Sequence, residues 1–201
     1  MKQFLKQNSQ AIRKFLLTHT VTSLLGIMVG LAIIGFEGED DTTGVLSIIA
    51  SVFTIGFMCF LHYDDMYFIG AKNAISAKGE GVELDKFRGL KITLLAFSPV
   101  VLIGIITIIL DLAVNTGNDE ATVSFLMIYY AVQGAFLSLW KLRLAVGVAG
   151  YVVITLFPPV IASVLGYIIG SKQKTLRGLL GFKVKPPYDG PIPEKKSRWF
   201  K

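Results

Sequence analysis

Residues 15–36 read FLLTHTVTSLLGIMVGLAIIGF, a run of 22 residues without a single charged side chain. The hydrocarbon core of a bilayer is about 30 Å thick, so a helix needs about 20 apolar residues to cross it. The whole chain is 53% hydrophobic and only 17% charged, which is unusual for a soluble domain. The run therefore predicts a membrane-spanning helix.

Three further runs have the length and apolar character of membrane spans. The expected bounds of all four are 15–36, 45–70, 92–114 and 144–170. A fifth run, residues 124–142, is shorter and rich in aromatic side chains. Because spans of this kind are helical, the predicted fold class is all-α, with a polytopic transmembrane domain over residues 1–170. Residues 171–201 are expected to form a basic cytoplasmic tail.

Positive charges alternate between the segments that connect these runs. Lys and Arg number four before the first run, none in residues 37–44, five in residues 72–91, none in residues 111–123 and nine after residue 170. Cytoplasmic segments of membrane proteins carry the excess of Lys and Arg. The alternation predicts four spans, with the N-terminus, the second loop and the tail in the cytoplasm.

The fifth run decides the number of spans. If residues 124–142 crossed the bilayer, the basic tail would be exported, against the charge rule. An aromatic and polar stripe at helical spacing along this run suits the level of the lipid headgroups. Its members are Tyr129, Gln133, Phe136 and Trp140. We expect an interfacial or re-entrant helix on the outer side, with a five-span topology as the alternative.

Three features indicate the kind of membrane. The chain has no N-x-[ST] glycosylation acceptor, and its lone Cys59 excludes an intramolecular disulfide. Basic and bulky apolar side chains mix in TLRGLLGFKVK (175–185), just after the last run, which suits an anionic inner leaflet. We expect the bacterial cytoplasmic membrane as the location and the lipid bilayer as a partner.

Ionisable side chains interrupt the second run in LHYDDMYFIG (61–70), at His62, Asp64 and Asp65. Counted from Val45, Asp64 is the twentieth residue, about 30 Å along a helix and level with the inner headgroups. If the apolar MYFIG that follows also belongs to the span, the acids lie about one turn inside the hydrocarbon. Ionisable groups at that depth mark functional sites. We expect boundary residues, and an ion or proton site is the alternative.

Metal binding by this segment is disfavoured. Cys59, His62 and Asp65 drift around the helix by more than a tight site allows. The other histidine, His19, lies among Thr and Ser residues, where an interhelical hydrogen bond is expected rather than ligation. The sequence predicts no metal and no cofactor. Basic residues available to the acids at the inner face are Arg13, Lys14 and Lys72.

Glycine pairs mark where helices can approach closely. The first run contains Gly26 and Gly30 in GIMVG, and the last contains Gly166 and Gly170 in GYIIG. In lipid, two small residues four apart allow two helix backbones to come together. The pairs indicate packing either within the bundle or between copies of the chain.

Pro158 and Pro159 lie in the middle of the last run, and Pro99 lies in the third. Proline has no N–H, so the carbonyls of Ile154 and Thr155 lose their helical donors. In hydrocarbon they need a hydroxyl, a neighbouring helix or water. The pair predicts a helix break, either a packed kink or a discontinuous helix that lines a substrate or ion site.

Enzyme signatures are absent from the sequence: it has no G-x-S-x-G, H-E-x-x-H or G-x-x-x-x-G-K-[ST]. The net charge of +6 is explained by cytoplasmic loops, so no nucleic-acid partner is implied. We expect a non-enzymatic subunit or accessory protein of a membrane complex, with a membrane-protein partner or as a homo-oligomer. The alternative is a small transporter or channel that uses the last run's prolines and the His62, Asp64 and Asp65 cluster.

Overall fold

The computed structural model describes residues 2–35, 42–81, 83–85, 87–114 and 120–172. These residues are almost entirely helical and include no strand. The elements are α1 (Lys2–Gly35), α2 (Thr42–Glu80), α3 (Arg88–Val114), α4 (Glu120–Val132), the 3-10 helix η1 (Gly134–Leu139) and α5 (Leu142–Ser171). The predicted all-α class is confirmed.

Within the described ranges, four helices are long and apolar enough to cross a bilayer: α1, α2, α3 and α5. Each contains most or all of one of the four predicted apolar runs. Large apolar side chains are exposed along their middle parts, among them Met28, Val52, Leu102 and Ile161. Soluble monomers rarely expose apolar surface on this scale. The predicted tail lies almost wholly outside the described residues.

α2 continues ten residues past the end expected at Gly70. Residues 71–80, AKNAISAKGE, are rich in Ala and Lys, which favour helix. Lys78 lies in the last turn, where a cation interacts favourably with the helix dipole. Gly81 then has a φ of 68°, the left-handed conformation that commonly ends a helix. Much of the segment expected as the second loop is therefore an extension of α2.

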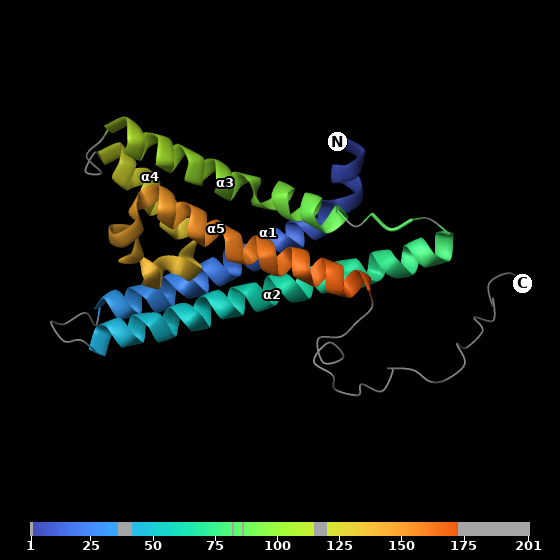
Figure 1. Ribbon diagram of the computed structural model, residues 1–201, viewed down its shortest axis with the longest axis horizontal. Coiled ribbons are helices and arrows are strands. Elements are labelled where there is room, and N and C mark those ends of the chain that lie inside the picture. The colour runs from blue at the N-terminus through green and yellow to red at the C-terminus, as the bar shows by residue number, and fades with distance from the viewer. Residues whose placement is uncertain (1, 36–41, 82, 86, 115–119, 173–201) are drawn as a thin grey trace, which may run out of the picture.

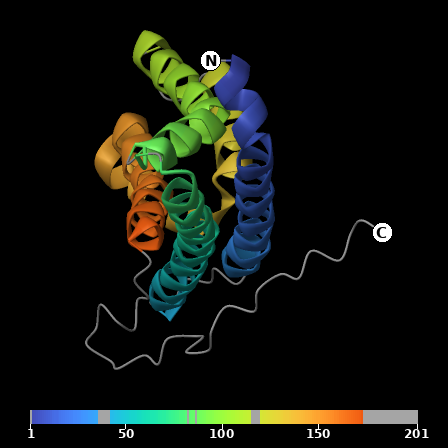
Figure 2. The same cartoon turned by 90° about the vertical axis from the view of Figure 1, so that its right-hand side faces the viewer.

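Consecutive long helices run in opposite directions, so α5 runs parallel to α2 and α3 runs parallel to α1 (Figure 1). α1 and α2 lie side by side, as do α3 and α4, and α5 packs mainly along α2 while it also contacts α3 (Figures 1 and 2). One end of the bundle holds the start of α1, the ends of α2 and α5 and the start of α3 (Figure 1). We call it the basic end, and its cations are Lys6, Arg13, Lys14, Lys72, Lys78, Arg88, Lys91 and Lys172.

α4 and η1 together form a hairpin that enters and leaves at the end opposite the basic end (Figure 1). α4 starts there, the chain turns at Gln133, and η1 returns between α1 and α2. Gln133 has φ −103° and ψ 37°, outside the α-helical region. The fifth apolar run is thus two short helices rather than one continuous helix.

This turn buries the aromatic stripe. Tyr129 and Gln133 are fully buried and Phe136 is 1% exposed. The prediction that these side chains face the lipid headgroups is wrong, because helical spacing was assumed to continue through Gln133. Of the stripe, only Trp140, beyond the turn, is partly exposed.

Side chains of neighbouring helices bond the non-α backbone of the turn. Hydroxyls donate to four carbonyls: Ser23 to Val132, Ser47 to Ser138, Thr54 to Ala135 and Tyr151 to Phe136, over 2.5–3.0 Å. Irregular backbone at membrane depth is tolerated only when protein groups or a wet cavity satisfy it. The Ser and Thr residues of α1 and α2 therefore stabilise the hairpin.

Both predicted glycine pairs lie at contacts inside the chain. A Cβ on Gly166 or Gly170 would collide with the carbonyl oxygen of Tyr63 or Tyr67 on α2. A Cβ on Gly26 would collide with the backbone of Ala135 in η1. Gly30 faces the side chain of Leu137, where a Cβ would lie 2.9 Å from Cγ. The pairs thus permit backbone-to-backbone packing of α5 on α2 and of η1 on α1.

The prolines do not interrupt α5. The helix runs through Pro158 and Pro159, and its non-helical residue is Gly147, with φ 73° and ψ 173°. This differs from the predicted break, which lies eleven residues farther along. Glycine adopts positive φ without steric cost, whereas the φ of proline is compatible with helix. α5 therefore bends near its start.

Candidate functional site

A cluster of ionisable side chains lies between α1 and α2, toward the basic end. Lys14 Nζ is 2.7 Å from Asp65 Oδ1, and the Thr18 hydroxyl donates to Asp65 Oδ2 at 2.5 Å. His19 Nδ1 lies 3.3 Å from His62 Nε2, so one imidazole donates to the other according to their tautomers. We call Lys14, His19, His62 and Asp65 the histidine cluster.

Helical spacing on two facing helices produces this cluster. Lys14 and Thr18 are four residues apart on α1, and His62 and Asp65 are three apart on α2, so each pair lies on one helix face. Phe15 stacks on His62 with ring centroids 4.3 Å apart. Phe97 of α3 meets His19 edge-on at 5.0 Å. The aromatic rings shield the imidazoles from the surroundings.

Each imidazole has one nitrogen outside the His19–His62 bond. His62 is fully buried and its Nδ1 has no hydrogen bond in the described part of the chain. His19 is 4% exposed; its Nε2 has no close partner there, but its imidazole lies near the Val132 carbonyl. An unsatisfied buried polar atom costs about 1–3 kcal/mol. Each such atom in a folded protein calls for a specific explanation.

Asp64 stands apart from the cluster. Its side chain is half-buried, and it makes no hydrogen bond or ion pair with any described residue. Successive residues of a helix point about 100° apart, so Asp64 and Asp65 face different ways. The three residues predicted as one cluster therefore divide: His62 and Asp65 face α1, and Asp64 does not.

Lys14 was among the cations predicted to be available to the acids, whereas the pairing of His19 with His62 was not predicted. The signal was present in α1, where Lys14, Thr18 and Thr22 repeat at four-residue spacing in an otherwise apolar stretch. Which face of α2 they meet depends on the crossing of the two helices. Within the described residues, no three His, Cys, Asp or Glu side chains are grouped to hold a metal ion.

A cavity of about 680 Å³ adjoins the cluster at the basic end. It lies between α1, α2, residues 83–85 and the start of α3, and Tyr167 of α5 closes one side. Lys14 and Asp65 belong to its wall. The histidine cluster is therefore next to a polar space that opens at this end of the bundle.

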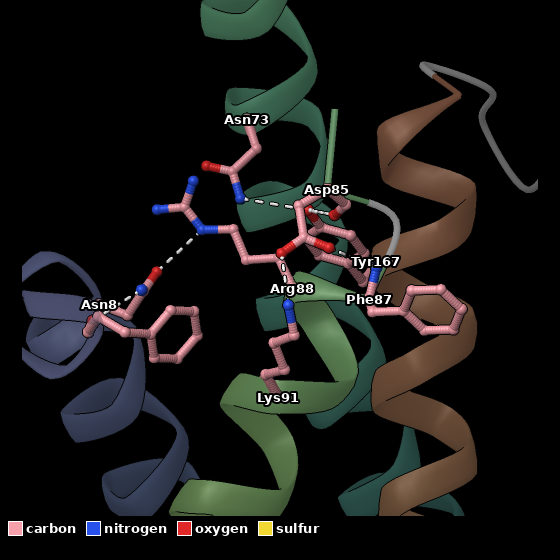
Figure 3. Close-up of polar contacts among 8 residues, drawn as sticks. Asn8, Asn73, Asp85, Phe87, Arg88, Lys91 and Tyr167 are labelled. Carbon is pink, nitrogen blue, oxygen red and sulfur yellow. Dashed lines mark hydrogen bonds and ion pairs between the residues drawn. The ribbon is translucent and has the colours of Figure 1, made fainter. Parts of the chain in front are cut away.

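A set of polar contacts holds the far wall of the cavity (Figure 3). The Tyr167 hydroxyl donates to the backbone carbonyl of Asp85 at 3.0 Å, and Asn73 Nδ2 lies 3.5 Å from the same hydroxyl. Arg88 Nε donates to Asn8 Oδ1 at 3.0 Å. These contacts tie α1, α2, α3 and α5 together around the cavity.

Whereas the backbone carbonyl of Asp85 bonds Tyr167, its carboxylate faces Lys91. It accepts hydrogen bonds from Lys91 Nζ and from the backbone N–H of Phe87, each at 2.9 Å. The hydrogen bond from Lys91 is the main reason that the pKa of Asp85 lies below its usual value. It outweighs desolvation, which by itself would raise the pKa. Asp85 therefore stays ionised and paired.

A second buried network joins α4 to the proline region of α5. The hydroxyls of Tyr129 and Thr155 are 2.7 Å apart, and Tyr129 also donates to the Val152 carbonyl at 3.2 Å. Gln133 Nε2 lies 3.5 Å from the Thr155 carbonyl, which has lost its helical donor to Pro159. The hairpin thus supplies a donor for one of the two carbonyls that the prolines leave without a helical partner.

No protein-family model matches this chain, and no curated protein or solved structure matches it.

Proposed function

We propose that this chain is a multi-pass membrane protein that carries protons across the bilayer through the histidine cluster. On this proposal, the protein is a small transporter or channel, and it works in the bacterial cytoplasmic membrane. The observation that carries the proposal is the buried His19–His62 pair beside the Lys14–Asp65 ion pair.

The proposed topology has α1, α2, α3 and α5 crossing the membrane with the basic end in the cytoplasm. Their exposed apolar side chains support this placement, and so does the gathering of Lys and Arg at one end. The α4–η1 hairpin would then be a re-entrant element that enters from the outer side. Its hydroxyl-bonded backbone meets the requirement for such a segment.

The chemistry of the cluster suits transfer of a proton. Imidazole accepts a proton on one nitrogen and releases one from the other. His62 Nδ1 has no partner among the described residues, and the His19 imidazole has only the Val132 carbonyl beside it apart from His62. The rings of Phe15 and Phe97 cover the pair, and the Val132 carbonyl lies beside His19. Asp65, paired with Lys14, lies about one turn from His62 on the same side of α2, in the direction of the cavity. On this proposal a proton that enters from the cavity passes the Asp65 carboxylate before it reaches the imidazoles.

Polar groups continue beyond His19 toward the opposite end. Thr22 and Ser23 lie one turn farther along α1, and Ser23 bonds the Val132 carbonyl in the hairpin. Gln133, at the turn of the hairpin, and Thr155, on α5, follow next. This column of hydroxyl and amide groups extends the polar interior across the middle of the bundle.

The proposal is tested by proton flux into liposomes that hold the purified full chain and a trapped pH-sensitive dye, driven by a potassium diffusion potential. Asp65→Asn and His62→Gln are each expected to lower the flux at least tenfold. Asp64→Asn is the matched control and should stay within twofold of the wild type. Flux no greater than that of protein-free liposomes would overturn the proposal, as would unchanged flux in both cluster variants.

The role of subunit or accessory protein stays a prediction. Its partner, whether another membrane protein or a second copy, would be found by cross-linking in membranes followed by purification of the full chain. A constant partner together with no proton flux would favour that role over transport.

A further inference from the structure

Arg88 begins α3 and is held in one orientation at the cavity wall. Its Nε donates to Asn8 Oδ1 at 3.0 Å, and Asn8 Nδ2 donates to the Phe4 carbonyl at 2.8 Å. Asn8 is only 4% exposed, and both ends of its amide are engaged. The amide therefore fixes the plane of the guanidinium without neutralising its charge.

The two terminal nitrogens of Arg88 make no hydrogen bond or ion pair with the described residues. Figure 3 shows them beyond Nε, on the side of the guanidinium away from Asn8, with no dashed line to them. The side chain is half-buried and lines the 680 Å³ cavity. A planar guanidinium fork with both terminal nitrogens available matches the two oxygens of a carboxylate or a phosphate.

The acids that line the cavity fall into two groups. Asp65 and Asp85 are paired with Lys14 and Lys91. Glu80 and Glu83 are exposed and have no partner among the described residues. The cavity therefore presents positive charge at Arg88, whose charge also acts on Asp85, and at Lys72, and it presents unpaired negative charge at Glu80 and Glu83.

We propose that this cavity binds a small zwitterion, with its oxyanion on the terminal nitrogens of Arg88 and its ammonium group facing Glu80 and Glu83. A simple anion would be attracted by Arg88 and Lys72 but repelled by Glu80 and Glu83, and the reverse holds for a simple cation, whereas a zwitterion can satisfy both signs. Small-molecule sites usually occupy about 300–1,000 Å³, and this cavity lies in that range. The proposal goes beyond proton transfer and does not depend on it, because binding is measured without flux.

Two sources share this chemistry: a free amino acid and the headgroup of phosphatidylethanolamine. Both carry an oxyanion and a primary ammonium group separated by a short chain. The cavity wall includes neutral amides of Gln7, Gln10 and Asn73 that suit either one.

The test is isothermal titration calorimetry of the full chain in uncharged dodecyl maltoside micelles. The probes are glycine, phosphoethanolamine, acetate and methylammonium. We expect at least one zwitterion to bind at least tenfold more tightly than acetate and methylammonium. A preference for glycine assigns the site to free amino acids. A preference for phosphoethanolamine, with displacement by phosphatidylethanolamine added to the micelles, assigns it to the headgroup.

Three variants test the residues. Arg88→Gln is expected to weaken zwitterion binding at least tenfold, and Lys78→Gln, an exposed cation of α2 outside the cavity wall, should leave it unchanged. Replacing both Glu80 and Glu83 by Gln should abolish the preference for the zwitterion over acetate. Because these two are exposed, their double variant is expected to fold even if Arg88→Gln does not.

Binding of none of the four probes would overturn the proposal. So would acetate binding as tightly as the zwitterions, or wild-type affinity in a folded Arg88→Gln variant. Zwitterion binding without proton flux would leave this proposal standing and remove the proposed function instead.

Discussion

His19 of α1 and His62 of α2 lie 3.3 Å apart, Nδ1 to Nε2, although 43 residues separate them in the chain. They are the two histidines of the sequence, and the crossing of two long helices brings them together. The same crossing places Lys14 against Asp65. A single helix contact therefore assembles the histidine cluster.

The hydrogen bond between the two imidazoles predicts an energetic coupling. In a double-mutant cycle of His19→Gln and His62→Gln, the two single losses of unfolding free energy should together exceed the loss in the double variant by about 0.5–1.5 kcal/mol. Unfolding in mixed detergent micelles, followed by circular dichroism, measures each loss. A coupling near zero would show that the imidazoles are neighbours without a stabilising bond.

Asp65 and Asp64 are expected to differ in their effects on stability. Asp65→Asn weakens the Lys14 ion pair and the Thr18 bond of a carboxylate that is 7% exposed, so it should cost about 1–3 kcal/mol. Asp64→Asn changes a half-buried side chain without a described partner and should stay within about 0.5 kcal/mol. Thermal unfolding of the two purified variants gives the comparison. Equal shifts would contradict the division of the two acids.

Close packing of α5 on α2 predicts a strong effect at Gly166. A Cβ there meets the Tyr63 carbonyl, and backbone cannot move as readily as a flexible side chain. Gly166→Ala should therefore destabilise the protein by about 1–3 kcal/mol. Gly56→Ala in α2 is the control, because a Cβ at this position would have nothing within 4 Å, and the change should stabilise the helix by up to about 1 kcal/mol. Unfolding midpoints shifted in the same direction would contradict the packing.

The Asp85–Lys91 ion pair predicts a dependence of stability on pH. The folded-state pKa of Asp85 is lowered, chiefly by the Lys91 hydrogen bond. Its contribution is therefore present above the unfolded-state pKa of about 3.9 and is lost as the pH falls through the lower folded-state value. Both side chains are well exposed, so solvent screening keeps the effect below about 1 kcal/mol.

The measurement compares the wild type with Lys91→Gln in thermal unfolding from pH 7 to pH 2. The wild type should be slightly more stable at pH 7, and the difference should vanish at the acidic end. A difference that grows on acidification would have the wrong sign for this pair.

The proposed topology predicts which side of the membrane two cysteines reach. In a Cys59→Ala background, Ser197→Cys should react with an impermeant thiol reagent only after the cells are opened. Glu120→Cys, at the start of α4, should react on intact cells. Labelling of Ser197→Cys on intact cells would instead place an odd number of crossings before the tail.

The four long helices could be predicted from the chain alone because length, hydropathy and charge are local properties. An uncharged run of 22 residues such as 15–36 has one stable arrangement in lipid, and it is helical wherever its neighbours lie. The uneven distribution of Lys and Arg likewise appears without any knowledge of contacts. These features are the same however the helices pack against one another.

The turn at Gln133, the bend at Gly147 and the pairing of His19 with His62 depended on the tertiary structure. The turn and the pairing each require a partner far along the chain: Ser23 for the Val132 carbonyl, and the face of α1 for His62. Helical periodicity treats a run as one continuous helix and cannot show where hydroxyls of another helix replace its backbone bonds. The free energy that holds these features comes from interhelical hydrogen bonds and close glycine contacts, which exist only once the helices have met.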